Sequence, residues 1–147
     1  MGRVTTARLR GLPSRLLALN AMHADRLANE GLAAVGARKW HYAVLAAIEE
    51  SGPASQSELS RRTGIYRSDL VAVINELAGA GLVERQPDPA DRRRNVITVT
   101  GPGRQRLGQL DRLLAAVQDE LLAPLAPPER AQLITLLQRL LDHHSAP

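Results

Sequence analysis

Apolar residues recur every three to four positions over most of the chain, a spacing that predicts amphipathic helices. Between residues 82 and 100 the pattern changes to short runs rich in Val, Ile and Thr, which predict strands. The helices are expected from residue 13 to Gly31 or Gly36, and at about 38–51, 55–62, 68–79, 101–121 and 128–143, with strands at 82–85 and 96–100. Residues 1–10 are polar and expected to be loose. The predicted fold class is mostly α with a small β-wing.

The stretch 55–100 reads helix, turn, helix and hairpin, the order of a winged helix-turn-helix. Ser55 and Glu58 form a capping-box pattern at the start of the first helix, and Gly64 lies in the turn. Such a unit places its second helix in a DNA major groove. The sequence therefore predicts a DNA-binding domain here.

The second helix of this unit, about 68–79, has two contrasting faces. Its buried stripe is expected to consist of Leu70, Val73, Ile74 and Leu77. The opposite face carries the short side chains of Ser68, Ala72 and Asn75, and Arg67 and Asp69 lie at its N-terminal end. A helix that lies against base edges needs such a face, because bulky groups would hold it away. An ordinary solvated face is the alternative, and the hairpin that follows favours DNA.

The loop of the hairpin concentrates arginine around Asp91. An arginine tip suits a narrow minor groove, where the negative potential is enhanced. Asp91 is expected to fix one guanidinium and so aim its neighbour. We expect Arg92 to enter the groove with Arg93 held by Asp91, or the reverse, and Arg85 and Arg94 to meet phosphates. A mobile, merely solvated loop is the alternative.

Composition narrows the classes of function without selecting one. The chain of 147 residues has a net charge of +4, which suits a nucleic-acid partner, and no Cys, so disulfides and thiolate metal sites are excluded. No complete dinucleotide or ATP loop and no metal-ligand spacing among the four His is present. We therefore expect no enzyme, cofactor or metal. No apolar run approaches membrane length and the N-terminus has no signal-peptide core, so a cytoplasmic protein is expected.

The terminal helices carry many leucines, and a single chain of this length has too few other apolar residues to cover them all. Leu16 and Leu19 mark the first helix, and Leu137, Leu140 and Leu141 mark the last. Packing against a second copy would cover them, so we expect a homodimer with two reading heads. The predicted organisation is an N-terminal arm and dimerisation helix at 1–36, a winged helix-turn-helix domain at 37–100 and C-terminal dimerisation helices at 101–147.

The chain resembles the MarR family of bacterial transcriptional regulators over nearly its whole length. The resemblance rests on Gly52-Pro-Ala-Ser-Gln-Ser-Glu-Leu59, on Gly79-Ala-Gly-Leu-Val-Glu-Arg85, and on Asp88-Pro-Ala-Asp-Arg-Arg-Arg-Asn95 closing on Val99-Thr100-Gly101. One departure is Tyr66, where many relatives have a short polar cap. Here either Ser68 caps the helix or Tyr66 contacts the DNA backbone.

This resemblance implies a homodimer on a pseudo-palindromic double-stranded operator, usually a repressor that a small aromatic or anionic effector releases. A winged-helix module for protein contacts alone is the alternative. The candidate DNA-contacting residues are Ser55, Gln56, Ser57, Arg62, Arg67, Ser68, Asp69, Ala72, Asn75, Arg85, Asp91, Arg92, Arg93 and Arg94. The operator, the target genes, the effector and the choice between repression and activation stay open.

A small-ligand site is expected between the first two long helices. His23 and His41 fall on the apolar stripes of their helices, Trp40 adjoins His41, and Arg26 lies about one turn beyond His23. With Val44, these residues suit a cleft for an aromatic acid. The alternative is that both histidines are structural and bonded to their neighbours.

Overall fold

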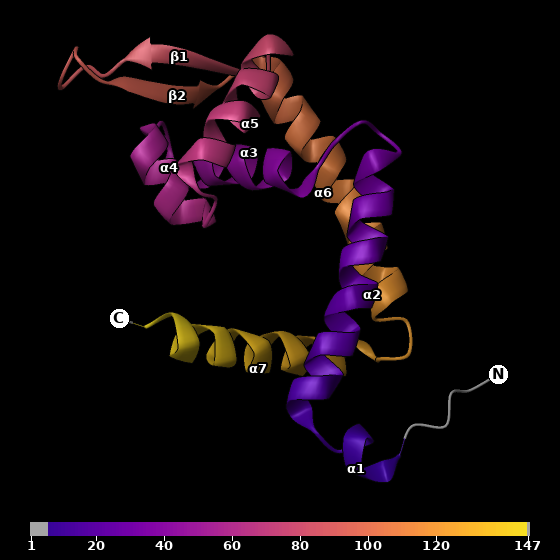
Figure 1. Ribbon diagram of the computed structural model, residues 1–147. Helices are drawn as coiled ribbons and strands as arrows, with labels where there is room; N and C mark the ends of the chain where they lie inside the picture. The colour runs from indigo at the N-terminus through magenta and orange to yellow at the C-terminus, as the bar shows by residue number, and fades with distance from the viewer. Residues whose placement is uncertain (1–5, 147) are drawn as a thin grey trace.

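The computed structural model describes residues 6–146, which are mostly helical with one two-stranded antiparallel sheet (Figure 1). The elements are α1 (Ala7–Arg10), α2 (Pro13–Ala33), α3 (Lys39–Ser51), α4 (Gln56–Thr63), α5 (Arg67–Gly79), β1 (Val83–Pro87), β2 (Asn95–Val99), α6 (Gly101–Leu121) and α7 (Pro127–Ser145). The winged helix-turn-helix expected from the sequence is thereby confirmed.

The N-terminal segment differs from the expectation of a loose arm. Ala7–Arg10 form α1, and the hydroxyl of Thr6 accepts a hydrogen bond from the backbone N–H of Leu9 at 3.4 Å. Residues 1–5 lie outside the described part of the chain. The expectation was wrong for residues 7–10 because a local cap starts this turn, and apolar spacing carries no signal for a cap.

One apolar core joins α3, α4, α5, the hairpin and the first half of α6. The predicted stripe of α5 is confirmed, because Leu70, Val73 and Ile74 are fully buried and Leu77 is 2% exposed. The other fully buried large members from α3 onward are Val44, Leu45, Ile48, Leu59, Val83, Ile97 and Leu110. We call residues 37–110, which close around this core, the winged body.

The hairpin begins one residue later than predicted. Gly81 has a left-handed backbone (φ 74°), its N–H bonds to the carbonyl of Ala78 at 3.0 Å, and the N–H of Leu82 bonds to that of Leu77 at 2.9 Å. This pair of bonds is a Schellman end of α5. Leu82 therefore belongs to the helix end, and the register of the sheet runs from Val83 opposite Val99 to Pro87 opposite Asn95.

Two contacts between distant segments fix the hairpin on the helices. Ala54 exchanges backbone hydrogen bonds with Ile97 at 3.2 and 2.7 Å, which ties the segment before α4 to β2. At the start of α6, a Cβ on Gly103 would lie 2.1 Å from the carbonyl oxygen of Leu82. Glycine at position 103 thus permits the close approach of α6 to the base of the wing.

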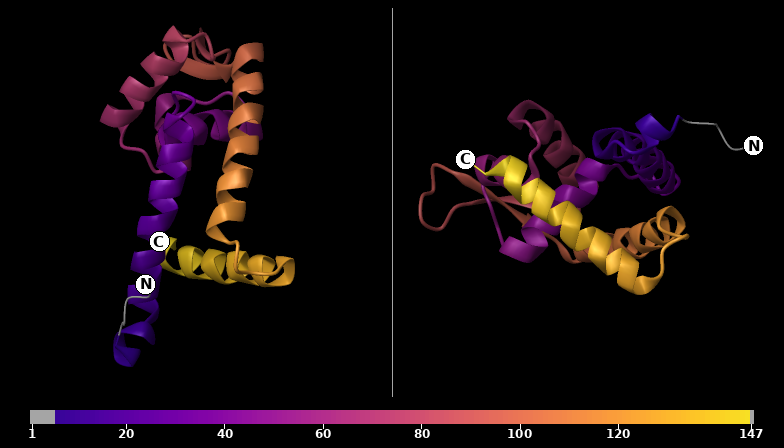
Figure 2. Two further views of the ribbon diagram at one scale, coloured as in Figure 1. Left: turned by 90° about the vertical axis from the view of Figure 1, so that its right-hand side faces the viewer. Right: turned by 90° about the horizontal axis from the view of Figure 1, so that it is seen from below.

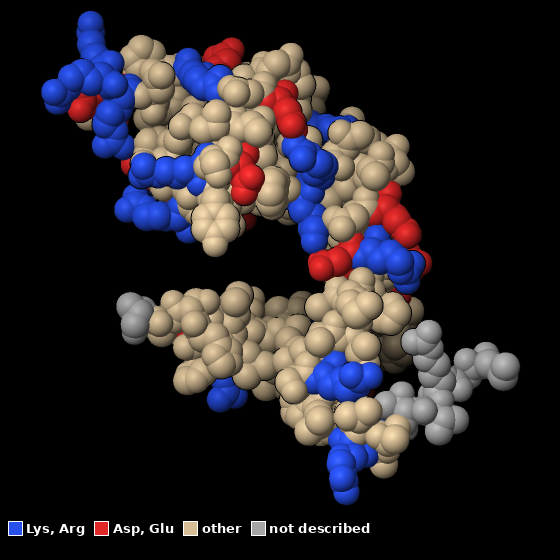
Figure 3. Space-filling view, viewed as in Figure 1, with Lys and Arg blue, Asp and Glu red and all other residues tan. Residues whose placement is uncertain are grey.

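The helices outside the winged body project away from it. Helix α2 packs along α6, with Gly31 lying close to Leu113 and Val117. Helix α7 leaves the end of α6 and runs beneath the winged body (Figures 1 and 2). None of its described residues is buried, and Figure 3 shows an open notch between α7 and the winged body.

Candidate nucleic-acid interface

A groove of about 550 Å³ opens where the starts of α4 and α5 face the wing. Its lining comes from four separate stretches of chain and is rich in arginine. The lining residues are Ser55, Gln56, Ser57, Glu58, Arg61, Arg67, Arg85, Arg94, Asn95 and Ile97. In the space-filling view, Lys and Arg gather at the wing end of the molecule, whereas most of the visible surface of α7 carries neither sign of charge (Figure 3).

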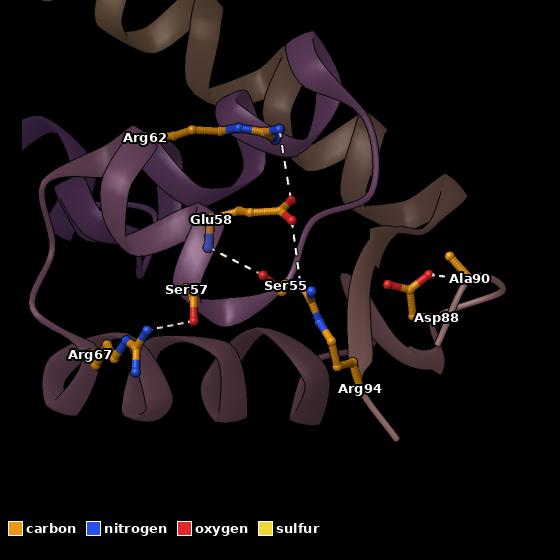
Figure 4. Close-up of polar contacts among 8 residues, drawn as sticks. All are labelled: Ser55, Ser57, Glu58, Arg62, Arg67, Asp88, Ala90 and Arg94. Carbon is orange, nitrogen blue, oxygen red and sulfur yellow. Dashed lines mark hydrogen bonds and ion pairs between the residues drawn. The ribbon is translucent and has the colours of Figure 1, made fainter. Parts of the chain in front are cut away.

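The start of α4 is fixed by a buried serine. The Ser55 hydroxyl accepts a hydrogen bond from the backbone N–H of Glu58 at 3.2 Å, which is half of the expected capping box. The other half is wrong, because the Glu58 carboxylate does not bond back to Ser55 but pairs with Arg62 and Arg94 (Figure 4). The nearby cations compete successfully for that carboxylate.

The angle between α4 and α5 is held by polar bonds of the turn. The Ser60 hydroxyl donates to the carbonyl of Ile65 at 2.6 Å, and Gly64 adopts the left-handed backbone (φ 73°) that ends α4. Arg67 on α5 donates through Nη2 to the Ser57 hydroxyl at 2.6 Å (Figure 4). The two helix starts therefore present their side chains as one unit.

The first turn of α5 has no side-chain cap. The helix starts at Arg67 with Tyr66 at the cap position, and Ser68 lies inside the first turn. The expectation that Ser68 caps the helix was therefore wrong, because the turn brings the helix start one residue earlier. The Tyr66 side chain is 80% exposed.

The outer face of α5 is short and open, as the sequence predicts. Ser68, Ala72 and Asn75 are exposed, and Asp69 is half-buried. Arg85 on β1 donates a hydrogen bond through Nη2 to Oδ1 of Asn75. The wing thus restrains the one amide of this face, a pairing that the sequence did not reveal because it joins two different elements.

The tip of the wing is ordered by its two aspartates. Asp88 Oδ1 accepts from the backbone N–H of Ala90 at 2.9 Å, and Asp91 Oδ1 accepts from Nε of Arg93 at 3.1 Å. The hydrogen bonds from Arg93 hold the pKa of the Asp91 carboxyl below its ordinary value. Among residues 6–146, Arg92 is exposed and has no hydrogen bond or ion pair. Of the two neighbours, Arg93 is the one that Asp91 holds.

Four lining residues of the groove were not among the candidate DNA-contacting residues: Glu58, Arg61, Asn95 and Ile97. Arg61 lies one turn after Ser57 on α4, so helical spacing from Ser57 would have placed it on the same face. Asn95 lines the groove from the first position of β2. Arg62, which was expected at the interface, instead pairs with Glu58 one turn earlier at 3.9 Å.

The five residues of the expected ligand cleft do not share one cavity. His23 and Arg26 are exposed on α2, and Arg26 pairs with Glu30 at 3.8 Å. Val44 is fully buried in the core. Trp40 lines one cavity of about 520 Å³ at the α2–α3 junction, and His41 lines another of about 440 Å³ between α3, α5 and α6. Adjacent positions on a helix point about 100° apart, which separates Trp40 from His41.

Both ring nitrogens of His41 already have partners. Nδ1 accepts from the backbone N–H of Arg38 at 3.2 Å, and Nε2 lies 2.6 Å from a carboxylate oxygen of Glu76. Arg38 also pairs with Glu76. The hydrogen bonds from His41 and then Arg38 lower the pKa of the Glu76 carboxyl. This arrangement favours a structural histidine that links α3 to α5.

Two further properties concern residues 6–146 only. They contain no cluster of three or more His, Asp or Glu placed to hold a metal ion. None of their helices combines the length and apolar character that crossing a membrane requires.

Comparisons with known proteins agree with this geometry. The model of the MarR family matches residues 36–94. A putative transcriptional regulatory protein for the hcr operon of Thauera aromatica is 36% identical over 99 residues, which cover 67% of this chain and 60% of that protein. The HTH-type transcriptional repressor NicR of Pseudomonas putida is 27% identical, over 69% of this chain and 64% of its own length. The chain thus matches less than two thirds of the length of either relative.

Solved structures extend the likeness to the terminal helices. A mutant MarR from E. coli complexed with operator DNA is 27% identical, with a TM-score of 0.76 over 93% of this chain and 99% of that chain. The match therefore includes both the winged body and the helices beyond it. On the family model, these relatives and the shared fold, the chain belongs to the MarR family.

Proposed function

We propose that this protein is a transcriptional regulator that binds double-stranded DNA sequence-specifically. The observation that carries the proposal is the joint surface of α5 and the wing. The short outer face of α5 stands beside a groove that four arginines line, and an arginine loop extends beyond it. Short side chains admit base edges, and the arginines neutralise phosphates on either side. The DNA-bound relative supports this assignment.

The role that we propose for each residue follows from the position of its side chain and from the contacts that already restrain it. Ser68, Ala72 and Asn75 would meet base edges, with Asn75 presented by its bond to Arg85. Arg92 would enter the minor groove, because Arg93 is occupied by Asp91. The remaining positions would bind phosphates or orient the helix starts: Ser55, Gln56, Ser57, Arg61, Arg62, Arg67, Asp69 and Arg94.

The working form is proposed to be a homodimer through residues 1–36 and 101–147, with residues 37–100 as the reading head. Leu137, Leu140 and Leu141 on α7 are between 40% and 65% exposed in the single chain, as are Leu12 and Leu17 near 45%. Exposed leucine on this scale marks an association surface. A symmetric pair of heads would fit a pseudo-palindromic operator in the cytoplasm.

We further propose repression that a small effector relieves. The cavity beside Trp40 also holds Asn29, Arg38 and Lys39, so it offers cations and one aromatic ring to an aromatic carboxylate. An effector acts only if it binds the DNA-incompetent form more tightly. Titration with aromatic carboxylates should quench Trp40 fluorescence and weaken DNA binding together. If no carboxylate of the panel changes either signal, this part of the proposal is wrong.

The DNA proposal is tested by selecting bound duplexes from a random pool and measuring affinity by fluorescence anisotropy over a salt series. Affinity for the selected duplex should fall steeply with salt and exceed that for a scrambled duplex. Asn75→Ala should cost about 1–3 kcal/mol on the selected duplex and relax one base position. The matched change Asn20→Ala, at an exposed position of α2, should leave binding intact. If the selection yields no shared sequence and affinity is insensitive to salt, a protein-contact module is the better explanation.

A further inference from the structure

The groove contains one acidic side chain among the described residues that line it, Glu58. The other charged members of the lining are all arginines. Elsewhere in the winged body acidic groups lie outside the groove, such as Glu49, which pairs with Arg104 at 3.0 Å. A carboxylate inside a surface that must receive phosphates opposes DNA through like charge. Its presence there calls for a physical role.

The two oxygens of Glu58 face arginines from two elements (Figure 4). Oε1 lies 3.4 Å from Nη2 of Arg94, which directly precedes β2 in the loop of the wing, and Oε2 lies 3.9 Å from Nη2 of Arg62 on its own helix. The Arg94 pair spans 36 positions of sequence, so it joins α4 to the wing. Glu58 thus connects the helix-turn-helix and the wing where DNA would enter.

The pair between Glu58 and Arg94 is open to exchange. The Glu58 side chain is 33% exposed and that of Arg94 is 50% exposed, so water reaches both partners. Ion pairs in such positions are weak and easily replaced. A phosphate offers a guanidinium the same kind of paired oxygens as a carboxylate, with at least as much negative charge. Arg94 can therefore pass from Glu58 to a DNA phosphate.

We propose that Glu58 is an internal competitor of DNA phosphate for Arg94 and thereby limits the affinity of this protein for DNA of any sequence. The inference rests on the proposed DNA binding. In the free protein the carboxylate occupies Arg94, and on DNA that bond is exchanged for a bond to a phosphate. This competition acts on phosphates, which carry no sequence information. Glu58 therefore lowers operator and non-specific affinity by similar factors.

The test measures the affinity of Glu58→Gln for the selected duplex and for a scrambled duplex by anisotropy at low and high salt. Glutamine keeps the size of the side chain and removes its charge. We expect affinity for both duplexes to rise about three- to tenfold at low salt, and the gain to shrink as salt increases. Glu49→Gln is the matched control, because it removes the same charge and the partner of Arg104 outside the groove. It should change affinity by less than about twofold.

A double-mutant cycle separates competition for Arg94 from a general charge effect. In an Arg94→Ala background, Glu58→Gln should gain less than about twofold, because Arg94, the guanidinium for which Glu58 competes with phosphate, is gone. An undiminished gain would overturn the proposal in favour of general repulsion, and a gain no larger than that of Glu49→Gln would overturn it outright. Thermal unfolding of each variant confirms that the fold is intact. If the wild-type protein binds no duplex, both the proposed function and the competitor role of Glu58 are wrong. If the wild-type protein binds DNA and Glu58→Gln has the same affinity as wild type, only the competitor role is wrong.

Discussion

Helices α5 and α7 carry the same kind of leucine-rich stripe, yet the chain covers only one of them. On α5, Leu70 and Ile74 are fully buried, whereas on α7 Leu140 is 46% exposed and Leu141 is 65% exposed. The difference does not arise from helical spacing, which is regular in both. It arises because α5 has α3, α4 and the hairpin around it, while α7 extends away from the rest of the chain. An apolar stripe thus predicts burial without saying what covers it.

The largest expected effect is in the covered stripe. Leu70→Ala removes a fully buried side chain and leaves a cavity, so it should lower the free energy of unfolding by about 2–5 kcal/mol. Urea denaturation followed by circular dichroism measures this. Val71→Ala, at a 40% exposed neighbour on the same helix, should stay within about 0.5 kcal/mol. Equal losses in the two variants would contradict the burial seen here.

The uncovered stripe should respond through association instead. Leu140→Glu places a charge on the proposed dimer surface and should cost about 1.5–3 kcal/mol of association free energy, or roughly ten- to a hundredfold in the dimer dissociation constant. Sedimentation equilibrium measures the constant, and far-UV circular dichroism should show the winged body intact. Gln138→Glu is the control, with the same charge at a polar position. A wild-type protein that is monomeric at micromolar concentration would refute the dimer.

A smaller effect is expected in the wing, which contributes to DNA binding and not to the core. Arg92→Ala should weaken binding to many sequences by about five- to tenfold at low salt and reduce the salt slope by about one unit. Arg93→Ala should cost less, because Asp91 already engages that guanidinium. Stability should not change in either variant. An Arg93→Ala loss that exceeds the Arg92→Ala loss would reverse the assignment between these two arginines.

The smallest effect is expected at the contact between α3 and α6. The Tyr42 hydroxyl donates to Asp111 at 2.7 Å, and this hydrogen bond, with burial and the nearby charges, raises the pKa of Tyr42 from 10.0 to about 12. Tyr42→Phe should lose about 0.5–1.5 kcal/mol of stability near neutral pH. Because the folded pKa is the higher one, this contribution is complete below pH 10.0 and disappears as pH rises through about 12.

The pH dependence supplies the check on this contact. Urea denaturation at several pH values should show the two proteins converging between pH 10.0 and about 12. Asp111→Asn should move the titration of Tyr42 downward, which tyrosinate absorbance can follow in a Tyr66→Phe background. A constant difference between wild type and Tyr42→Phe across this pH range would show that the hydroxyl does not titrate as described.

The features of this molecule that involve residues close together in the chain could be predicted from the sequence. At the start of α6, the Thr100 hydroxyl accepts a hydrogen bond from the backbone N–H of Gly103 at 3.0 Å, and threonine is a residue type that favours such a cap. The stripe of α5 and the αL turn at Gly64 follow the same rule. Each of these features involves residues within one or two helical turns, so the local sequence contains both partners.

The proposed ligand cleft illustrates the opposite case. His23 and His41 both lie at apolar positions of the helical pattern, yet His23 is exposed on α2 and His41 bonds to Glu76 on α5. The apolar pattern predicts on which face of its helix each histidine lies, but it does not predict which other element packs against that face. Helix α2 lies mainly against α6, and this packing separates the two histidines.

The sequence by itself determined the order of the elements, the buried stripe of α5 and the arginine-rich wing, because helical period, caps and turns act over a few residues. Only the tertiary structure decided that Glu58 faces Arg94, that Arg85 holds Asn75, and that α7 lies uncovered. These features depend on how segments dozens of residues apart pack together. Several packings satisfy the same local pattern, and the shared core selects one of them.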